Sequence, residues 1–170
     1  WNGSIRLRSL EVAPVETTAA LSVTVSPARL PEKQALHNCG WGYVHSSMLK
    51  DYPAEAIADQ VAHGTDVFVG TFFPQARFDA TGNLVGEIDY REHDAYVKQH
   101  ACHGIILFCG YQGALQGPAA ADSDAYRQAH VQWLRAWVKH LAELGVGYDG
   151  FALYPVDEPG LSQGLVAAYL

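Results

Sequence analysis

The sequence is poor in basic residues. It has 11 Lys and Arg against 18 Asp and Glu, a formal net charge of -7, and no run of basic residues. Because binding to a phosphate backbone needs clustered Lys and Arg, this composition argues against a nucleic-acid partner. No stretch approaches the ~20 consecutive apolar residues of a membrane span, so no membrane partner is predicted either.

Cysteines and cofactor motifs are also scarce. The three cysteines are Cys39, Cys102 and Cys109, and none belongs to a CxxC pair. An odd number of scattered cysteines fits neither a disulfide framework nor a zinc site, so we expect buried free thiols. A Cys102–Cys109 bridge is the alternative if the protein is secreted. Neither a dinucleotide or P-loop glycine motif nor a G-x-S-x-G elbow is present, and we predict no cofactor and no metal. The compartment is left open, a secreted or cell-surface location included.

Residues 1–31 have the pattern of two strands. Apolar and polar residues alternate in Ser4–Val12 and in Leu21–Ser26, which indicates half-buried strands joined by a loop over Ala13–Thr18. Two strands alone are marginally stable. We therefore interpret this region as the last hairpin of a β-sandwich domain, followed by a linker.

Residues 32–170 repeat a different unit: an amphipathic helix, a glycine, then a short apolar strand. The helix-ending glycines Gly64, Gly104 and Gly145 recur at nearly constant spacing. Pro53 suits a first helical turn, and glycine suits the position after a last one. The expected helices are Pro53–Ala62, Asp89–His103 and Ser123–Leu144, and the expected strands are one within Ala35–Val44, then Val67–Val69, Ile105–Phe108 and Phe151–Tyr154.

Continuous apolar strands between amphipathic helices indicate a parallel sheet covered by helices. The fold class is therefore α/β, and we interpret residues 32–170 as the N-terminal half of a (β/α)8 TIM-like barrel, with about the first four βα units. The remainder of the barrel would come from further chain in the full-length protein. A doubly wound sheet is the structural alternative.

In both architectures the active site lies beyond the carboxyl ends of the strands. The last expected strand is followed there by two adjacent acids, Asp157 and Glu158, between prolines. Two close carboxylates repel, so one of them is expected to stay protonated near neutral pH. A protonated acid beside an ionised one is the arrangement that cleaves glycosidic bonds, and both residues are the predicted catalytic groups. The alternative is a solvated surface turn.

Aromatic side chains accompany the acids in the same stretches. Flat rings stack on the apolar faces of sugars, which predicts a carbohydrate substrate. Core packing is the alternative, above all for Phe73. The predicted substrate-binding residues are Trp41, Phe73, Tyr111 and Tyr154.

The segment Leu144–Pro159, with the sequence LGVGYDGFALYPVDEP, resembles the catalytic-strand region of glycoside hydrolase family 123 and its relatives of unassigned function. The likeness covers most of residues 20–160, including the order of β-sandwich, linker and barrel. It implies retaining hydrolysis of a β-linked N-acetylhexosaminide, in which the 2-acetamido oxygen of the substrate attacks the anomeric carbon. By position, Glu158 resembles the general acid/base, and Asp157 resembles the residue that orients the acetamido group.

Two other functions fit the same residues. One is a barrel glycosidase that keeps Glu158 as the acid but carries a separate carboxylate nucleophile on a later strand. The other is a non-catalytic carbohydrate-binding protein on a hydrolase fold, in which both acids only bind sugar hydroxyls.

Overall fold

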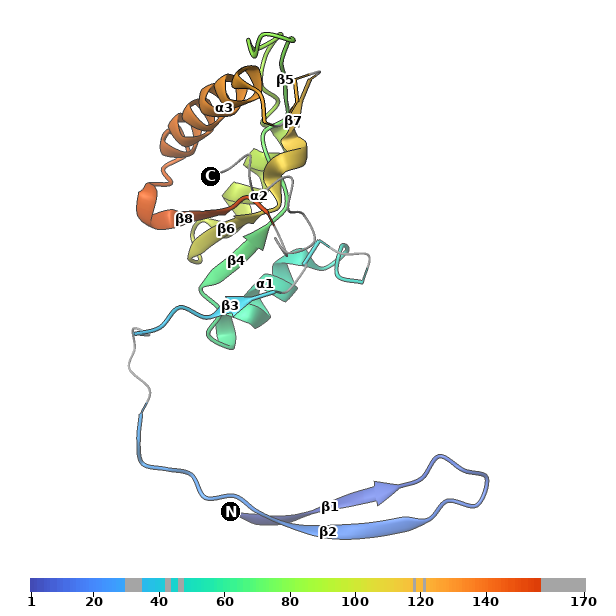
Figure 1. The fold of residues 1–170 in the computed structure, drawn as a ribbon. Helices are drawn as coiled ribbons and strands as arrows, with labels where there is room; N and C mark the ends of the chain where they lie inside the picture. Colours follow the sequence, from blue (N-terminus) through green and yellow to red (C-terminus); the bar gives the residue numbers. More distant parts are fainter. Residues whose placement is uncertain (30–34, 42–43, 46–47, 118, 121, 157–170) are drawn as a thin grey trace. The chain divides into compact units, whose positions relative to one another are not determined.

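The computed structural model describes residues 1–29, 35–41, 44–45, 48–117, 119–120 and 122–156, except for the side chain of Gln112. The chain divides into two compact units, Trp1–Ala35 and Leu36–Leu170, whereas the boundary expected from the sequence followed residue 31. Figure 1 shows a hairpin in the first unit, and helices with a parallel sheet in the second.

The first unit is an antiparallel hairpin of β1 (Asn2–Arg8) and β2 (Glu16–Ser22). The two predicted strands are confirmed, but both begin and end earlier than expected. The segment Thr17–Thr18 was predicted as loop and lies in β2, where its β-branched side chains suit an extended ladder. The connection is closed instead by Ser9, whose hydroxyl accepts a hydrogen bond from the Val15 amide at 3.0 Å.

The hairpin has one apolar face. Ile5 lies opposite Ala19, and Leu7 lies opposite Thr17, on the same side of the ladder. Their side chains are 46% and 55% exposed. The two strands of the hairpin do not themselves cover this face, and a surrounding β-sandwich stays a prediction.

The second unit is built on a four-stranded parallel sheet whose strands follow one another in chain order. A doubly wound sheet reverses its strand order at a switch point, whereas a barrel adds each strand beside the last. The observed order is compatible with barrel-like winding, but the described strands close no barrel, so the barrel stays a prediction. The strands, from one edge to the other, are β3 (Cys39–Gly40), β4 (Val67–Gly70), β6 (Ile105–Cys109) and β8 (Phe151–Tyr154).

The connecting helices are α1 (Pro53–Ala62), α2 (Arg91–His100) and α3 (Asp124–Glu143). The prediction for α1 is confirmed at both ends. The helix α3 begins after Ser123, whose hydroxyl accepts a hydrogen bond from the Tyr126 amide at 3.1 Å. Gly145 follows this helix with a φ of 83°, a left-handed conformation that glycine adopts without strain.

The helix α2 is shorter than predicted at both ends. The helix was expected to begin at Asp89, but the backbone of Asp89 pairs with Gln75 through hydrogen bonds of 2.9 and 3.0 Å. Its carboxylate accepts hydrogen bonds from the backbone and the guanidinium of Arg91. The helix therefore begins only at Arg91, because Asp89 is held in an extended loop.

One face of the sheet packs against the helices. Ile106 and Phe108 point to this face and are fully buried against Trp133 and Trp137 of α3. Both indoles also satisfy their N–H groups: that of Trp133 donates to the Pro74 carbonyl at 2.9 Å. Burial of such large rings dominates the stability of a small core.

The opposite face of the sheet is apolar but less covered. Val69, Leu107 and Ala152 are neighbours in register on this side. Val69 and Leu107 are half-buried and Ala152 is exposed in the described part of the chain. In a closed barrel these side chains would line the interior.

The loops after β4 and β6 are tied together by a second, small sheet that the sequence did not predict. It consists of β5 (Ala76–Arg77) and β7 (Leu115–Gln116), which pair in parallel, and a 3-10 turn at Tyr111–Ala114 precedes β7. Strands of two residues carry no readable alternation. Their pairing holds the two loops side by side at the carboxyl edge of the main sheet.

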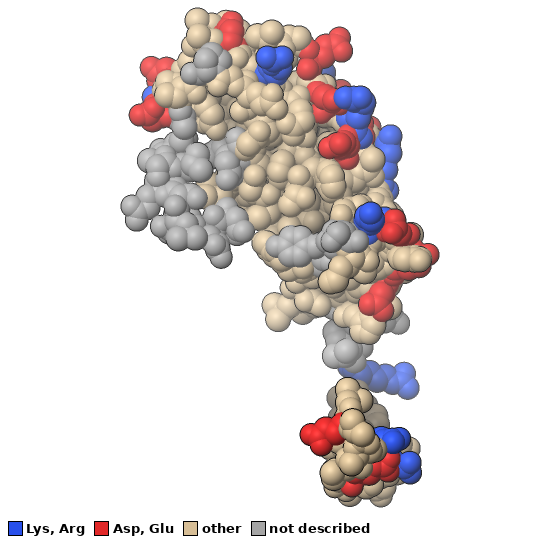
Figure 2. All heavy atoms as spheres, turned by 90° about the vertical axis from the view of Figure 1, so that its right-hand side faces the viewer, with Lys and Arg blue, Asp and Glu red and all other residues tan. Residues whose placement is uncertain are grey.

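All three cysteines are free thiols, as predicted, but only Cys109 is buried. Cys39 and Cys102 are exposed, so the expectation of burial was wrong for these two. Figure 2 shows Asp and Glu side chains interspersed with Lys and Arg along one margin of the second unit, with uncharged residues across the middle of this face. None of the helices in the described ranges is long and apolar enough to cross a bilayer.

Candidate active site

The predicted catalytic acids, Asp157 and Glu158, lie outside the described residues. The chain that leads to them is described as far as Val156, which is 6% exposed. Just before it, the Tyr154 carbonyl accepts a hydrogen bond from the Gly110 amide at 2.8 Å. The segment is thus fixed to the carboxyl end of β6 immediately before the two acids.

Two of the predicted sugar-binding aromatics lie outside the hydrophobic core, with Trp41 exposed and Tyr154 half-buried. Trp41 directly follows β3 and is 43% exposed. Tyr154 ends β8 beside Cys109, and strand alternation puts it on the same side as Ala152, away from the helices. Both rings lie at the carboxyl edge of the sheet, where the sequence placed them.

The other two predicted aromatics pack against the core. Tyr111 is 3% exposed, and its ring lies 5.5 Å from Trp133 and 5.7 Å from Trp137 between centroids. Burial raises the pKa of its phenol to about 12. Phe73 is half-buried, with its centroid 6.2 Å from those of Tyr111 and Trp137. In this structure Tyr111 offers no ring face to a sugar, whereas Phe73 borders a pocket.

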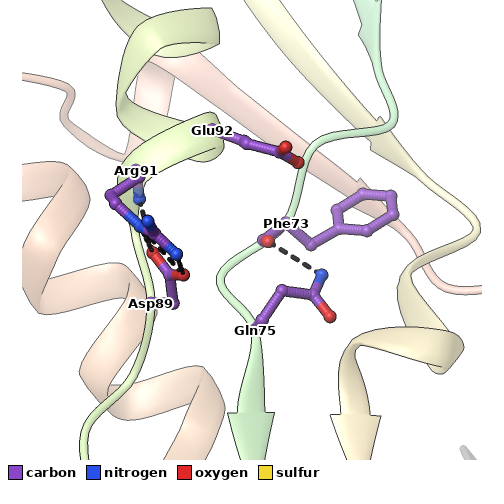
Figure 3. Close-up of a pocket in the computed structure, with 5 residues that line it drawn as sticks. All are labelled: Phe73, Gln75, Asp89, Arg91 and Glu92. Atoms are coloured by element: carbon purple, nitrogen blue, oxygen red, sulfur yellow. Dashed lines mark hydrogen bonds and ion pairs between the residues drawn. The ribbon is translucent and has the colours of Figure 1, made fainter.

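This pocket, the Phe73 pocket, has a volume of about 310 Å³ and lies between the loop after β4 and the start of α2. Its polar side chains differ in the partners that they bind, as Figure 3 shows. Arg91 forms an ion pair with Asp89. Hydrogen bonds from the side chain and the backbone of Arg91 lower the pKa of Asp89 to about 2. Gln75 donates to the Phe73 carbonyl at 3.1 Å. Glu92 is the other acid of the pocket.

Glu92 also borders a second pocket of about 210 Å³, the His45 pocket. The His45 ring is in edge contact with Phe72 at 5.3 Å. Its Nε2 atom is buried and makes no hydrogen bond among the described residues. Burial lowers the pKa of His45, so the imidazole is neutral at neutral pH. The other lining residues are Ala95, Tyr96 and Gln99.

A separate cluster joins α2 to α3. His93, Asp94 and His140 place possible ligand atoms within 4.8 Å of one another, the one such group in the described ranges. Asp94 Oδ1 lies 3.0 Å from His93 Nδ1 and 2.8 Å from His140 Nε2. Burial raises the pKa of Asp94, but hydrogen bonds from both histidines outweigh this and hold it below its usual value.

The indole of Trp137 decides what this cluster can bind. It donates to His93 Nε2 at 2.8 Å, and an indole N–H can only donate. Burial lowers the pKa of His93, so the ring is neutral and its one proton must be on Nδ1, facing Asp94. This atom has no lone pair for a metal ion. The cluster is a hydrogen-bond relay between two helices and does not fit a metal.

Sequence reasoning missed Glu92 and Gln75 as pocket residues. Both lie close to stretches that follow a strand, but nothing local distinguishes Glu92 from any other acid in a first helical turn. The available signal was the order of the elements. The helix α2 follows β4, so its first turn is expected near the carboxyl edge of the sheet. The sequence also places His93 and His100 on one face of α2, which indicates two histidines on the buried side of this helix.

Comparison with family models, with curated proteins and with solved structures found no match to this chain.

Proposed function

We propose that this protein is a retaining glycoside hydrolase that acts on β-linked N-acetylhexosaminides with assistance from the acetamido group of the substrate. The observation that carries the proposal is the placement of β8. It continues the strand order beside β6, and its carboxyl end leads through buried Val156 directly into Asp157 and Glu158. In barrels and doubly wound sheets alike, this edge is where catalytic groups gather.

The chemistry needs two steps. In the first, the acetamido oxygen bonds to the anomeric carbon as the glycosidic bond breaks, and Glu158 donates its proton to the departing oxygen. In the second, Glu158 takes a proton from water as the water oxygen bonds to the same carbon and displaces the acetamido oxygen. Each step inverts the configuration, so the two together retain it.

Asp157 is assigned a positioning role in this scheme. An ionised carboxylate beside the acetamido N–H would accept its hydrogen bond and stabilise the positive charge that develops as the oxygen attacks. Trp41 and Tyr154, at the same edge of the sheet, are the rings that this proposal assigns to contact the sugar.

The test is the hydrolysis of aryl β-N-acetylhexosaminides by the full-length protein and its Glu158→Gln variant. We expect kcat to fall by about 10²- to 10⁴-fold, the usual contribution of a general acid/base. Glu55→Gln, an exposed acid in α1, is the matched control and should leave the rate unchanged. Equal rates for the wild type and Glu158→Gln would rule the assignment out.

A second substrate series separates the two hydrolytic mechanisms. Aryl glycosides with a 2-hydroxyl in place of the 2-acetamido group lack the internal nucleophile. Acetamido assistance predicts that they are not hydrolysed, whereas a carboxylate nucleophile on a later strand predicts that they are.

A further inference from the structure

The Phe73 and His45 pockets share features that a catalytic cleft alone does not explain. They border the same side chain, Glu92, and lie on the loop after β4, whereas the predicted acids follow β8. In the sheet, β6 separates these two strands. A ligand in the pockets would therefore be held away from the reacting bond, but at the same edge of the sheet.

The charges in the Phe73 pocket restrict the ligand. Arg91 and Asp89 neutralise each other, so Glu92 leaves the pocket with a net negative charge. Glu92 is exposed, and its carboxylate also interacts electrostatically with Arg91, but two acids against one guanidinium still leave a net negative charge. An anionic ligand such as a phosphate would be repelled, whereas hydroxyl groups can donate to the four lone-pair positions of the carboxylate.

The remaining walls suit the same kind of ligand. Phe73 borders one pocket and Phe72 the other, and both supply apolar surface. Gln75 and Gln99 add amides, and His45 Nε2 is a buried nitrogen without a partner among the described residues. Such nitrogens are uncommon unless a ligand or water completes them. With about 310 and 210 Å³, the pockets lie at or below the small end of ligand sites, which fits single rings.

We propose that the two pockets around Glu92 form a sugar-binding subsite that holds units of an oligosaccharide beyond the one that is cleaved. This inference rests on the proposed function for the identity of the sugar. Glu92 accepts hydrogen bonds from ring hydroxyls, and the amides of Gln75 and Gln99 bind further polar groups. Phe72 and Phe73 exclude water from the apolar edges of the rings.

The experiment measures binding by isothermal titration calorimetry, with a β-linked N-acetylhexosamine tetrasaccharide and the corresponding monosaccharide. The full-length protein carries Glu158→Gln in every sample, so that turnover does not consume the ligand. Glu92→Gln is compared with Glu55→Gln, which removes an acid from the first turn of α1 in the same way. Thermal unfolding of both variants shows whether each is folded.

We expect Glu92→Gln to weaken tetrasaccharide binding about tenfold or more, the usual effect of losing hydrogen bonds to a charged group. Monosaccharide binding and the Glu55→Gln control should be unchanged. Equal tetrasaccharide affinities for the two variants, or no tetrasaccharide binding in their common background, would overturn the subsite. Failure of the proposed function is visible separately, because it appears as hydrolysis that persists in Glu158→Gln whatever Glu92 does to binding.

Discussion

The two faces of the parallel sheet differ in how completely they are covered. On the helix side, Ile106 and Phe108 are fully buried under α3, whereas on the other side Val69 and Leu107 are half-buried and Ala152 is exposed. Both sets are apolar, so the sequence encodes burial on both sides. If the proposed barrel closes, its further strands would cover the second face as they cover the interior of a barrel.

The largest effect is expected on the covered face. Trp137→Ala removes a fully buried indole and its hydrogen bond to His93, and should lower the free energy of unfolding by about 3–5 kcal/mol. Denaturant unfolding of the full-length protein measures this. Val131→Ala, on the exposed side of the same helix, is the control and should cost less than about 0.5 kcal/mol. Similar costs for the two variants would contradict the packing described for α3.

Substitution on the other face tests whether a barrel closes. If further strands cover Leu107, Leu107→Ala should cost about 2–5 kcal/mol in the full-length protein, as for other buried leucines. If Leu107 stays half-buried, as in the described strands, the same substitution should lower the free energy of unfolding clearly less. A loss below about 1 kcal/mol would show that the face stays open and would remove the barrel from the proposal.

A smaller effect depends on pH and again concerns the covered side. His100 is fully buried, and burial lowers its pKa from 6.5 to about 4. The unfolded chain therefore takes up a proton near pH 6.5, but the folded protein does so only near pH 4. Stability is thus fully present above pH 6.5 and falls as the pH drops through this window, by about 2 kcal/mol at pH 5 from this residue.

His100→Phe should remove this loss. The variant keeps the ring stack on Tyr96, which has a centroid distance of 4.0 Å. It removes Nε2, which is buried without a hydrogen-bond partner among the described residues, and also the 2.9 Å hydrogen bond between Nδ1 and the Tyr96 carbonyl. We expect the stability of the variant to depend less on pH between 6.5 and 5, as measured by urea unfolding at several pH values. The other histidines with lowered pKa values are present in both proteins, so a pH dependence identical to that of the wild type would count against His100 as the source.

Local patterns predicted the elements whose ends depend on neighbouring residues. Pro53 marks the start of α1, and the apolar run Phe151–Tyr154 matches β8 at both ends. The start of α2 was missed because Asp89 is held by Gln75, which lies far from it in the sequence. Helix ends that depend on such distant pairing have no local signal.

The candidate site likewise has features that the sequence predicts and features that it does not. The edge of the sheet that carries it follows from the alternation of helices and strands, and Trp41 and Tyr154 lie there. Tyr111 was expected at an open position, but Trp133 and Trp137 pack against its ring. Which aromatic remains accessible depends on how α3 packs, and the Glu92 pockets depend on how closely the loop after β4 approaches α2.

The small ladder of β5 and β7 couples the loop after β4 to the loop after β6, although the two loops are far apart in the sequence. Ala76 is in register with Leu115, and Arg77 with Gln116. A deletion in either loop would shift this register unless the other loop changed with it. The wall that carries Phe73 and the turn that leads away from β6 therefore have to vary in length together, so related chains that alter one are expected to alter both.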